Sequence, residues 1–503
     1  MPDPPENPLT EGLERLPVHP TALVIFGGMG DLARRKLLPA LYNLAAEGAL
    51  PERFSLIGVS RSALPDADFR TQAGEAVREF SRREPDEKVL DALLADARYV
   101  SGSFDAEDLY PRLGEALDGF DAASGQKLNR AFYLSTAPDH FPVIVEALGR
   151  HGLTAHDGAE VRVIIEKPFG TTLAEALALN ESVLEVLDES QVFRIDHYLG
   201  KETVQNMLAF RFANGMFEPL WNRNHISNVQ ITAAEDIGIG SRAGYYDNAG
   251  GLRDLMQNHM MQLLTLLCME PPVDFSAQEI RDEKVKVLHA IAPPEPDRTF
   301  RAQYAPGIVA GKEVRGYLGE DGVRAASNTE TFAAVRLTVQ NWRWAGVPFY
   351  LRTGKRLSRK VTEIAVTLRP VPHQAFNREG SVGVQPNQLI FTVQPNEGVT
   401  MKLGAKIPGT RMRVQDVNME FLYGTTFLSQ SPEAYEKLIM DAMRGDATLF
   451  TRNDEVEAQW RIMDPVVARW EGDPGPLVQY DAGSPGPPGA DAILADGDIW
   501  RAI

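Results

Sequence analysis

Cysteine is almost absent from this chain of 503 residues, which contains only Cys268. One thiol cannot form an intrachain disulfide, and it does not provide a cysteine-based metal site. Its apolar neighbours Leu266, Leu267 and Met269 predict an ordinary buried thiol. The sequence thus gives no reason to expect a disulfide framework, and we expect no bound metal.

Positive charge is also scarce, because 51 Lys and Arg stand against 69 Asp and Glu, a formal net charge of −18. A nucleic-acid surface needs a basic stripe that neutralises phosphates, so this balance argues against a nucleic-acid partner. Any anionic ligand must be bound by a local cluster of Lys, Arg and His side chains.

Long hydrophobic runs are missing as well. No apolar run approaches the roughly 18 residues of a membrane span. Residues 1–20 are rich in proline and acidic side chains and lack the basic and apolar regions of a signal peptide, so we expect a flexible leader and a cytoplasmic protein. With 44% hydrophobic residues the chain can bury large cores, and its length predicts two or three domains.

Short apolar segments alternate with helical patterns in the first 200 residues. Helical spacing of leucines marks Asp31–Glu47, and Phe141–His151 also reads as a helix. The expected buried strands are 21–28, 54–59, 131–134 and 161–165. This alternation predicts an α/β Rossmann-type dinucleotide-binding domain over residues 21–200, with helices on both faces of a parallel sheet.

The pattern changes after residue 200. Strands of mostly alternating polarity are expected at 228–234, 331–340, 362–368, 388–394 and 400–403. They predict a large, mainly antiparallel sheet with one covered face, in an α+β substrate-binding and oligomerisation domain over residues 201–503. Helices are expected at 250–269 and 433–449, and the Pro- and Gly-rich segment 481–489 is expected to be irregular.

A glycine-rich turn, Gly27-Gly28-Met29-Gly30-Asp31-Leu32-Ala33, joins the first expected strand to the first helix. Gly27 permits a tight turn, Gly30 lets the backbone approach a pyrophosphate, and the small Ala33 lets helix and strand pack closely. The helix N-terminus then offers N–H groups and a partial positive charge to the phosphates. A glycine-rich turn alone is weak support, but its place between strand and helix predicts a nucleotide site.

The end of the second strand bears on the choice of nucleotide. An NAD enzyme usually places an acid there, whereas this strand ends in Ser60-Arg61, with no acid before Asp66. A guanidinium can pair with the oxygens of a 2′-phosphate, so Arg61 predicts NADP. The alternative interpretation of Arg61 is a solvated loop residue.

The stretch Arg194–Thr203 gathers several reactive side chains into a few positions. It holds a carboxylate, Asp196, an imidazole, His197, a phenol, Tyr198, and an ammonium, Lys201. Three of these can donate to one phosphate, and a carboxylate can orient a general base. The stretch therefore predicts an enzyme for an anionic, phosphorylated metabolite.

Three further segments carry candidate residues. Lys167 follows a strand at the edge where doubly wound folds bind ligands. Arg253–His259 lies near the start of an apolar helix, and Arg352–Lys360 is densely basic. His197 and His259 have the alternative interpretation of buried structural histidines, and the run Lys355–Lys360 that of a solvated charged face. Moreover, Asp254 and His259 do not share a face of an ideal α-helix, so their convergence needs an irregular helix start.

Taken in order, these motifs resemble those of the glucose-6-phosphate dehydrogenase family, from about Leu23 to near the C-terminus. The matching motifs are Gly-Asp-Leu-Ala at 30–33, Glu-Lys-Pro-Phe-Gly at 166–170, Arg-Ile-Asp-His-Tyr-Leu-Gly-Lys-Glu at 194–202, Arg-Asp-X-X-Gln-Asn-His at 253–259 and Arg-Thr-Gly-Lys at 352–355. The resemblance implies NADP-dependent oxidation of D-glucose 6-phosphate to 6-phospho-D-glucono-1,5-lactone, the first step of the oxidative pentose phosphate pathway.

The resemblance also implies a role for each matching position. His259 would be the general base and Asp196 its carboxylate partner. The substrate phosphate would be bound by His197, Tyr198, Lys201 and Lys360, and the sugar by Lys167, Glu235, Asp254 and Lys355, with Gln394 as an addition. The cofactor would contact Gly27, Gly30, Asp31, Leu32, Lys36, Arg61 and Lys167, and no metal would be required. The family's dimers and tetramers imply a homo-oligomer.

One departure from the family pattern concerns the cofactor turn. Gly28 and Met29 stand where the family usually has Ala and Ser, so a hydroxyl that can bond a cofactor phosphate is missing. Two other readings of the whole sequence remain. They are a related dehydrogenase that acts on another aldose phosphate, and an inactive relative that binds NADP or assists a partner enzyme.

Overall fold

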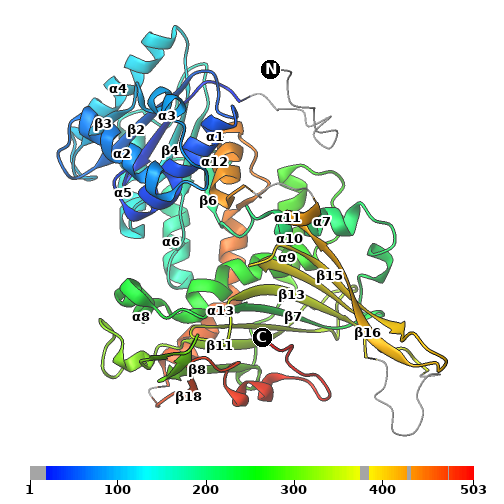
Figure 1. Ribbon diagram of the computed structural model, residues 1–503. Coiled ribbons are helices and arrows are strands. Elements are labelled where there is room, and N and C mark those ends of the chain that lie inside the picture. Colours follow the sequence, from blue (N-terminus) through cyan, green and yellow to red (C-terminus); the bar gives the residue numbers. More distant parts are fainter. Residues whose placement is uncertain (1–17, 374–384, 427–431, 474) are drawn as a thin grey trace. The chain divides into compact units, whose positions relative to one another are not determined.

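The computed structural model describes residues 18–373, 385–426, 432–473 and 475–503. Most of the expected leader, residues 1–17, lies outside the described residues. The chain forms two compact units (Figure 1). The first comprises the chain up to Lys167 together with Leu179–Ile195 and Tyr435–Leu449, and the second comprises Pro168–Ala178, Asp196–Ala434 and Phe450–Ile503.

The first unit contains a parallel sheet. Six of the seven strands of this sheet are β1 (Thr21–Phe26), β2 (Phe54–Ser60), β3 (Arg98–Ser101), β4 (Asn129–Leu134), β5 (Val161–Ile165) and β6 (Val192–Ile195). They lie in the order β3-β2-β1-β4-β5-β6, and every neighbouring pair is parallel. This order is that of the Rossmann fold, with the strand order reversing between β1 and β4. The predicted fold class of the N-terminal half is confirmed.

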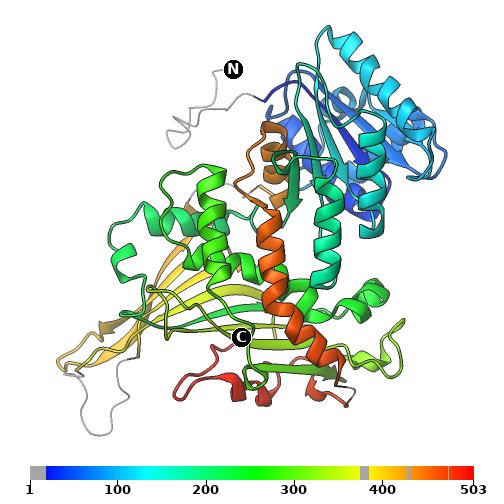
Figure 2. The same ribbon diagram turned by 180° about the vertical axis from the view of Figure 1, so that it is seen from behind.

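Helices cover both faces of this sheet, as the two opposite views show (Figures 1 and 2). They are a π-helix, η1 (Ala33–Leu37), then α1 (Leu38–Ala46), α2 (Asp66–Phe80), α3 (Glu87–Leu94), α4 (Leu109–Ser124), α5 (Phe141–Arg150) and α12 (Ala434–Arg444), while α6 (Leu173–Leu184) is divided between the units. Every residue of β1 and β4 is buried, as expected for strands covered on both sides.

The helix α12 packs with the first unit although it lies late in the sequence. Glu436, which is buried, accepts hydrogen bonds from Arg82 (2.7 Å) and from Asn43 (2.9 Å). A buried carboxylate needs such partners, because an unpaired one would be strongly destabilising. Through these contacts the segment around α12 packs within the first unit, although the residues on either side of it belong to the second.

The second unit is built on a nine-stranded sheet. Its strands are β7 (Ile226–Ala234), β8 (Thr299–Ala305), β11 (Phe332–Thr338), β12 (Pro348–Gly354), β13 (Val361–Leu368), β14 (Gln388–Gln394), β15 (Gly398–Lys406), β16 (Val414–Leu422) and β18 (Val478–Asp481). Their order is β16-β15-β14-β13-β7-β12-β11-β8-β18. The β7–β12 and β8–β18 pairs are parallel and the others antiparallel, so the predicted mainly antiparallel sheet is confirmed.

The longer helices of this unit are α7 (Glu202–Phe212), α8 (Ala243–Gly251), a π-helix, η6 (Leu252–Met260), then α9 (Met261–Cys268), α10 (Ala277–His289) and α13 (Asn453–Glu471). A short hairpin, β9 (Gly307–Val309) and β10 (Lys312–Val314), lies apart from the main sheet. Cys268 at the end of α9 is 1% exposed, which confirms the predicted buried thiol. In the described part of the chain, no helix combines the length and hydrophobicity needed to cross a membrane.

The prediction of a sheet with only one covered face is wrong for its centre, because the C-terminal segment covers the second face. Asn228 donates to Asp498 (2.8 Å), and Gln230 donates to Ile499 O (2.8 Å) and accepts from the N–H of Arg501 (2.8 Å). In Figure 1 the red C-terminal segment crosses in front of the sheet, whereas in Figure 2 the orange α13 does so from the opposite side. The polar side chains that suggested a solvated face are therefore buried by the end of the chain.

Candidate active site

The glycine-rich turn lies at the carboxyl end of β1, next to the point where the strand order reverses. Gly27 has φ +81°, and a Cβ there would lie 2.1 Å from Ser135 O, so only glycine fits. Its N–H donates to Val59 O (2.7 Å). In open α/β sheets, ligands bind at this reversal point. The tight turn predicted for Gly27 is confirmed, and the cradle suits the close approach of a phosphate.

The turn continues directly into the first helix. Gly30 N–H donates to Gly27 O (2.8 Å), and a Cβ on Gly30 would lie 3.1 Å from that oxygen. Asp31 and Leu32 begin the helical segment that continues as η1. The carboxylate of Asp31 is exposed and pairs with Arg35 (2.7 Å). The backbone N–H groups of a helix N-terminus are the groups that bind a phosphate.

The other cofactor candidates lie on the same unit. Arg61 is exposed and directly follows Ser60, the last residue of β2. Lys36 is half-buried within η1, and Lys167 is half-buried two residues after β5. The structure therefore places Arg61 at the strand end where the sequence pattern required it.

Sequence reasoning overlooked Glu166, the residue before Lys167. Glu166 is 8% exposed and accepts a hydrogen bond from Tyr133 (2.5 Å). Burial raises the pKa of Glu166 to about 7, and hydrogen bonds to its carboxylate oppose this rise. Glu166 directly follows β5 and precedes Lys167 in the chain.

The second unit holds the expected pair of carboxylate and imidazole. Asp196 Oδ1 lies 2.5 Å from His259 Nδ1, and the two side chains are 3% and 1% exposed. The same carboxylate oxygen accepts the backbone N–H of Tyr198 at 3.0 Å. A second donor holds the carboxylate in place, so its orientation toward the imidazole does not depend on the histidine alone.

Two aromatic rings enclose the imidazole of His259. The Tyr198 ring stacks on it with centroids 4.3 Å apart, and the His197 ring meets it edge-on at 4.6 Å. The ammonium of Lys201 lies 5.9 Å from the centre of the Tyr198 ring. The predicted phosphate-binding side chains His197, Tyr198 and Lys201 therefore lie beside the candidate base, on one short loop.

The phenol of Tyr198 is buried against β13. Its hydroxyl lies 3.5 Å from Thr362 Oγ1, and Gln394 Nε2 donates to the same Thr362 oxygen at 2.9 Å. Burial raises the pKa of Tyr198 well above its ordinary value, so the phenol stays protonated and can donate. Gln394 thus contacts the cluster indirectly, because both it and Tyr198 lie against Thr362. The sequence pattern did not single out Thr362.

The helix that carries His259 is a π-helix, η6. This explains how Asp254 and His259 can lie near each other although they do not share a face of an α-helix. The C-terminal N–H of η6, that of Met261, bonds to the carbonyl of Met256, five residues earlier. In a π-helix, residues five apart lie one turn apart, so Asp254 and His259 lie near the same face. The irregular helix start that the sequence required is therefore present.

A buried acid caps the start of η6. Gly250 has φ +69°, and a Cβ there would lie 2.4 Å from Glu330 Oε1. Glu330 accepts the N–H of Leu252 at 2.9 Å. The close approach requires glycine at position 250, and the carboxylate fixes the first turn of the helix.

A second cluster of charges surrounds Asp254. Its carboxylate oxygens lie 3.9 Å from Lys355 Nζ and 3.9 Å from Arg242 Nη2, and Lys355 also donates to Glu235. Glu235 and Lys355 follow β7 and β12, which are parallel neighbours with Ala234 opposite Gly354. The sheet register therefore brings the two residues together. Carboxylates and an ammonium in one cluster suit the recognition of several hydroxyl groups.

The basic run Arg352–Lys360 does not form a single patch. Arg352 is buried, donates to Thr232 (3.0 Å) and lies over the Trp500 ring at 4.6 Å. Lys360 is exposed and directly precedes β13. The structure thus separates this run into a buried structural arginine, a lysine in the Asp254 cluster and an exposed lysine near Thr362.

The arrangement around His259 is suited to proton abstraction. The carboxylate of Asp196 holds the Nδ1 side of the ring, so the other ring nitrogen, Nε2, is the atom at which the imidazole can take a proton. The nearby carboxylate then stabilises the imidazolium that forms. Such general-base catalysis contributes about 10²–10⁴-fold to rate.

Comparisons with known proteins agree along the whole chain. A family model described as glucose-6-phosphate dehydrogenase, NAD binding domain, matches residues 24–206, and one described as glucose-6-phosphate dehydrogenase, C-terminal domain, matches residues 208–501. The chain is 49% identical over 502 residues to glucose-6-phosphate 1-dehydrogenase 2 of Mycobacterium tuberculosis, with 98% of each chain covered. It is 45% identical over 493 residues to glucose-6-phosphate 1-dehydrogenase of Chlamydia pneumoniae, with 96% of each covered.

Solved structures give the same result. A structure of glucose-6-phosphate dehydrogenase in complex with its substrate glucose-6-phosphate is 36% identical, with a TM-score of 0.88 over 96% of this chain and 99% of that one. The crystal structure of glucose-6-phosphate 1-dehydrogenase from Mycobacterium avium is also 36% identical, with a TM-score of 0.83 over 96% and 98% of the two chains.

Proposed function

Because the chain belongs to the glucose-6-phosphate dehydrogenase family, we propose that it catalyses the NADP-dependent oxidation of D-glucose 6-phosphate to 6-phospho-D-glucono-1,5-lactone, the first step of the oxidative pentose phosphate pathway. The observation that carries this proposal is the buried hydrogen bond between Asp196 and His259, which lies beside a loop of phosphate-binding side chains.

Oxidation of a cyclic hemiacetal requires removal of one hydride from C1 and one proton from its hydroxyl. The nicotinamide of NADP provides the hydride acceptor. His259 takes the proton at Nε2, and Asp196 keeps the ring oriented and stabilises its positive charge. The burial of both side chains excludes water that would weaken this interaction.

The substrate is held at its two ends. The phosphate is bound by His197, Tyr198, Lys201 and Lys360, and the sugar is contacted by Lys167, Glu235, Asp254 and Lys355. The stacking of His197 and Tyr198 around the imidazole supports this arrangement, because a phosphate on this loop holds the substrate next to the base. Binding energy from the phosphate then positions C1 for reaction.

The cofactor is bound by Gly27, Gly30, Asp31, Leu32, Lys36, Arg61 and Lys167. The Cβ-free cradle at Gly27 supports a pyrophosphate at the helix start, and exposed Arg61 at the end of β2 supports the 2′-phosphate that distinguishes NADP from NAD. The proposed cofactor-binding domain comprises residues 21–200 and the proposed substrate-binding domain residues 201–503, of which Tyr435–Leu449 belongs to the first compact unit.

The protein acts in the cytoplasm as a homodimer or homotetramer, and the second domain supports self-association. Sedimentation analysis of the purified chain tests the oligomer. A mass corresponding to two or four chains is expected, and a monomer over the working concentration range would contradict it.

The proposed reaction is tested by following NADPH absorbance with a panel of sugar phosphates. Rapid NADPH formation with glucose 6-phosphate, and much slower formation with other aldose phosphates, is expected. Faster turnover of another aldose phosphate would reassign the substrate, and no turnover with any sugar phosphate would contradict the proposal.

A further inference from the structure

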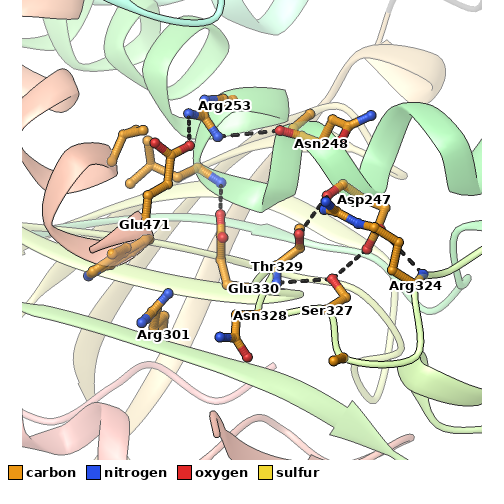
Figure 3. Close-up of a pocket in the computed structure, with 15 residues that line it drawn as sticks. Asp247, Asn248, Arg253, Arg301, Arg324, Ser327, Asn328, Thr329, Glu330 and Glu471 are labelled. Atoms are coloured by element: carbon orange, nitrogen blue, oxygen red, sulfur yellow. Dashed lines mark hydrogen bonds and ion pairs between the residues drawn. The ribbon is translucent and has the colours of Figure 1, made fainter. Parts of the chain in front are cut away.

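A cavity of about 490 Å³ lies on the second unit beside the helix that carries His259 (Figure 3). Its lining includes Leu252 and Arg253 of η6 but neither Asp254 nor His259. Pockets for small metabolites usually measure roughly 300–1,000 Å³, so the cavity is of suitable size. It shares a helix with the proposed active site but not its side chains.

Three arginines from separate elements line this cavity. Arg253 belongs to η6, Arg301 to β8, and Arg324 to the segment before β11. Figure 3 shows Arg301 with Glu471 on one side and Arg324 with Asp247 on the other. Guanidinium groups bind phosphate and carboxylate groups through paired N–H donors. Cations on two sides of one cavity suit a ligand with an anionic group at each end.

The two outer arginines retain donors for such a ligand. Among the described residues, Arg301 contacts Asp473 through Nη2, at 2.9 Å to its carbonyl and 3.3 Å to its carboxylate. Arg324 binds Asp247 through Nε (2.5 Å) and Nη2 (2.8 Å). The Asp473 side chain is 71% exposed, and such surface pairs stabilise little, so an anion can compete for Arg301.

The remaining lining suits the carbon portion of a metabolite. Trp470, Val467 and Leu252 supply apolar surface, and Asn328 supplies an amide between the two cationic ends. The Arg301 guanidinium lies 5.8 Å from the Trp470 ring centre. Pockets with mixed walls of this kind bind small polar metabolites through a few fixed polar groups.

Arg253 connects the cavity with the proposed active site. It precedes Asp254 directly, and its side chain donates to Thr171 O (2.9 Å), Asn248 O (3.3 Å) and Glu471 (2.5 Å). An anion beside Glu471 competes for this arginine and repels the carboxylate. A change in these contacts would shift the turn of η6 that carries both Arg253 and Asp254, and so would move the Asp254 carboxylate.

We propose that this cavity is a regulatory site for a small metabolite with an anionic group at each end, such as a sugar bisphosphate. One end binds Arg301 beside Trp470, and the other binds Arg324. Occupancy changes the affinity for the substrate through Arg253 and Asp254. Only this last effect rests on the proposed function, because binding in the cavity does not depend on turnover.

The binding is tested by calorimetry on the full chain, with fructose 1,6-bisphosphate as probe and saturating glucose 6-phosphate present to occupy the substrate loop. We expect one bound probe per chain. Arg301→Met and Arg324→Gln should each weaken binding at least ~10-fold, because each removes charge-assisted hydrogen bonds. Arg324 is 66% exposed, so its variant should fold even if Arg301→Met does not.

Matched controls separate this site from the rest of the molecule. Arg461→Gln, on α13 outside the cavity, should bind the probe normally, and inorganic phosphate should bind much more weakly than the bisphosphate. The binding proposal is overturned by absent binding, by binding to both arginine variants that is as tight as binding to the unaltered chain, or by loss of binding in Lys201→Ala. Equally tight binding of inorganic phosphate would overturn the two-ended ligand.

The regulatory effect has its own measurement. The probe should change KM for glucose 6-phosphate in the unaltered enzyme and leave it unchanged in Arg324→Gln. An equal change in both would overturn the regulatory effect. If no sugar phosphate is oxidised, the proposed function fails while calorimetry still decides whether the cavity binds the probe.

Discussion

The carboxylate of Asp196 lies 2.5 Å from the imidazole of His259, although the two residues are 63 positions apart in the sequence. Asp196 is held by the N–H of Tyr198, and His259 is enclosed by the rings of Tyr198 and His197. The hydrogen bond therefore joins the loop proposed to bind phosphate to the helix proposed to carry the base. This one contact therefore links the proposed site of phosphate binding to the proposed site of proton removal.

The choice of cofactor depends on Arg61. Arg61→Ala should lower kcat/KM for NADP by about 10–100-fold, the value of charge-assisted hydrogen bonds to a phosphate, and leave kcat/KM for NAD nearly unchanged. Steady-state kinetics with both cofactors measures this. Arg53→Ala is the matched control, because Arg53 is an exposed arginine just before the opposite end of β2. An Arg61 variant with unaltered NADP use would refute the assignment.

Sugar recognition depends on Lys355, which lies between Glu235 and Asp254. Lys355→Met leaves these two carboxylates without their shared cation, so KM for glucose 6-phosphate should rise at least ~10-fold while KM for NADP changes little. Arg359→Met, an exposed substitution in the same basic run, is the control. Equal KM values in the Lys355 variant and the control would contradict the role.

The C-terminal segment should stabilise the second unit. Deletion of residues 499–503 removes at least one hydrogen-bond partner from each of Gln230, Arg352 and Glu363, and each polar group left unsatisfied costs about 1–3 kcal/mol. The midpoint of thermal unfolding should therefore fall by several degrees, as calorimetry can measure. Asp496→Asn, an exposed change in the same segment, should have no such effect. An unchanged midpoint after deletion would show that the segment is not structural.

Glu166 should make stability depend on pH. Burial raises its pKa from 4.5 to about 7 in the folded protein. Below pH 4.5 the carboxyl is protonated in both states, whereas between pH 4.5 and 7 it ionises in the unfolded chain first. This group therefore lowers the free energy of unfolding as pH rises through that range, and adds no further change above it.

The substitution Glu166→Gln should remove this contribution. The midpoint of thermal unfolding of the variant should fall less between pH 4.5 and 7 than that of the unaltered protein. Glu160→Gln, at an exposed position just before β5, should keep the original pH dependence. Parallel pH profiles for the Glu166 variant and the unaltered protein would contradict the assigned burial effect.

The N-terminal fold was predictable because each strand carries its own signal. The apolar run of β1 ends in Gly27, and the structure shows that no larger residue fits there. β5 was predicted with its observed bounds, since four of its five residues are apolar and buried. Parallel strands buried on both faces read as continuous apolar runs, so local sequence suffices.

The geometry around Asp254 was less predictable. Sequence spacing shows that Asp254 and His259 do not share a face of an α-helix, but it does not specify how the backbone adapts. The π-helix depends on the start fixed by Gly250 and Glu330, which are 80 positions apart, and on packing that no local pattern reveals. The proximity of Glu235 and Lys355 likewise depends on the parallel pairing of β7 with β12, which local sequence does not reveal.

The prediction that one face of the second sheet is solvated was wrong at its centre for a physical reason. The alternating polar residues of β7 indicated a solvated face, but Asn228 and Gln230 bind the end of the chain. The sequence does not show whether a polar side chain forms hydrogen bonds with water or with a buried backbone group. β12 was obscured in the same way, because Arg352 within it reads as part of a charged run.

The step on which the proposed mechanism depends is the removal of the C1 hydroxyl proton by His259. Its most direct test is the rate of NADPH formation from glucose 6-phosphate by His259→Asn, together with the Kd of the variant for NADP. We expect a fall in kcat of about 10²–10⁴-fold with a nearly unchanged Kd for NADP. Near-normal kcat in this variant would contradict it.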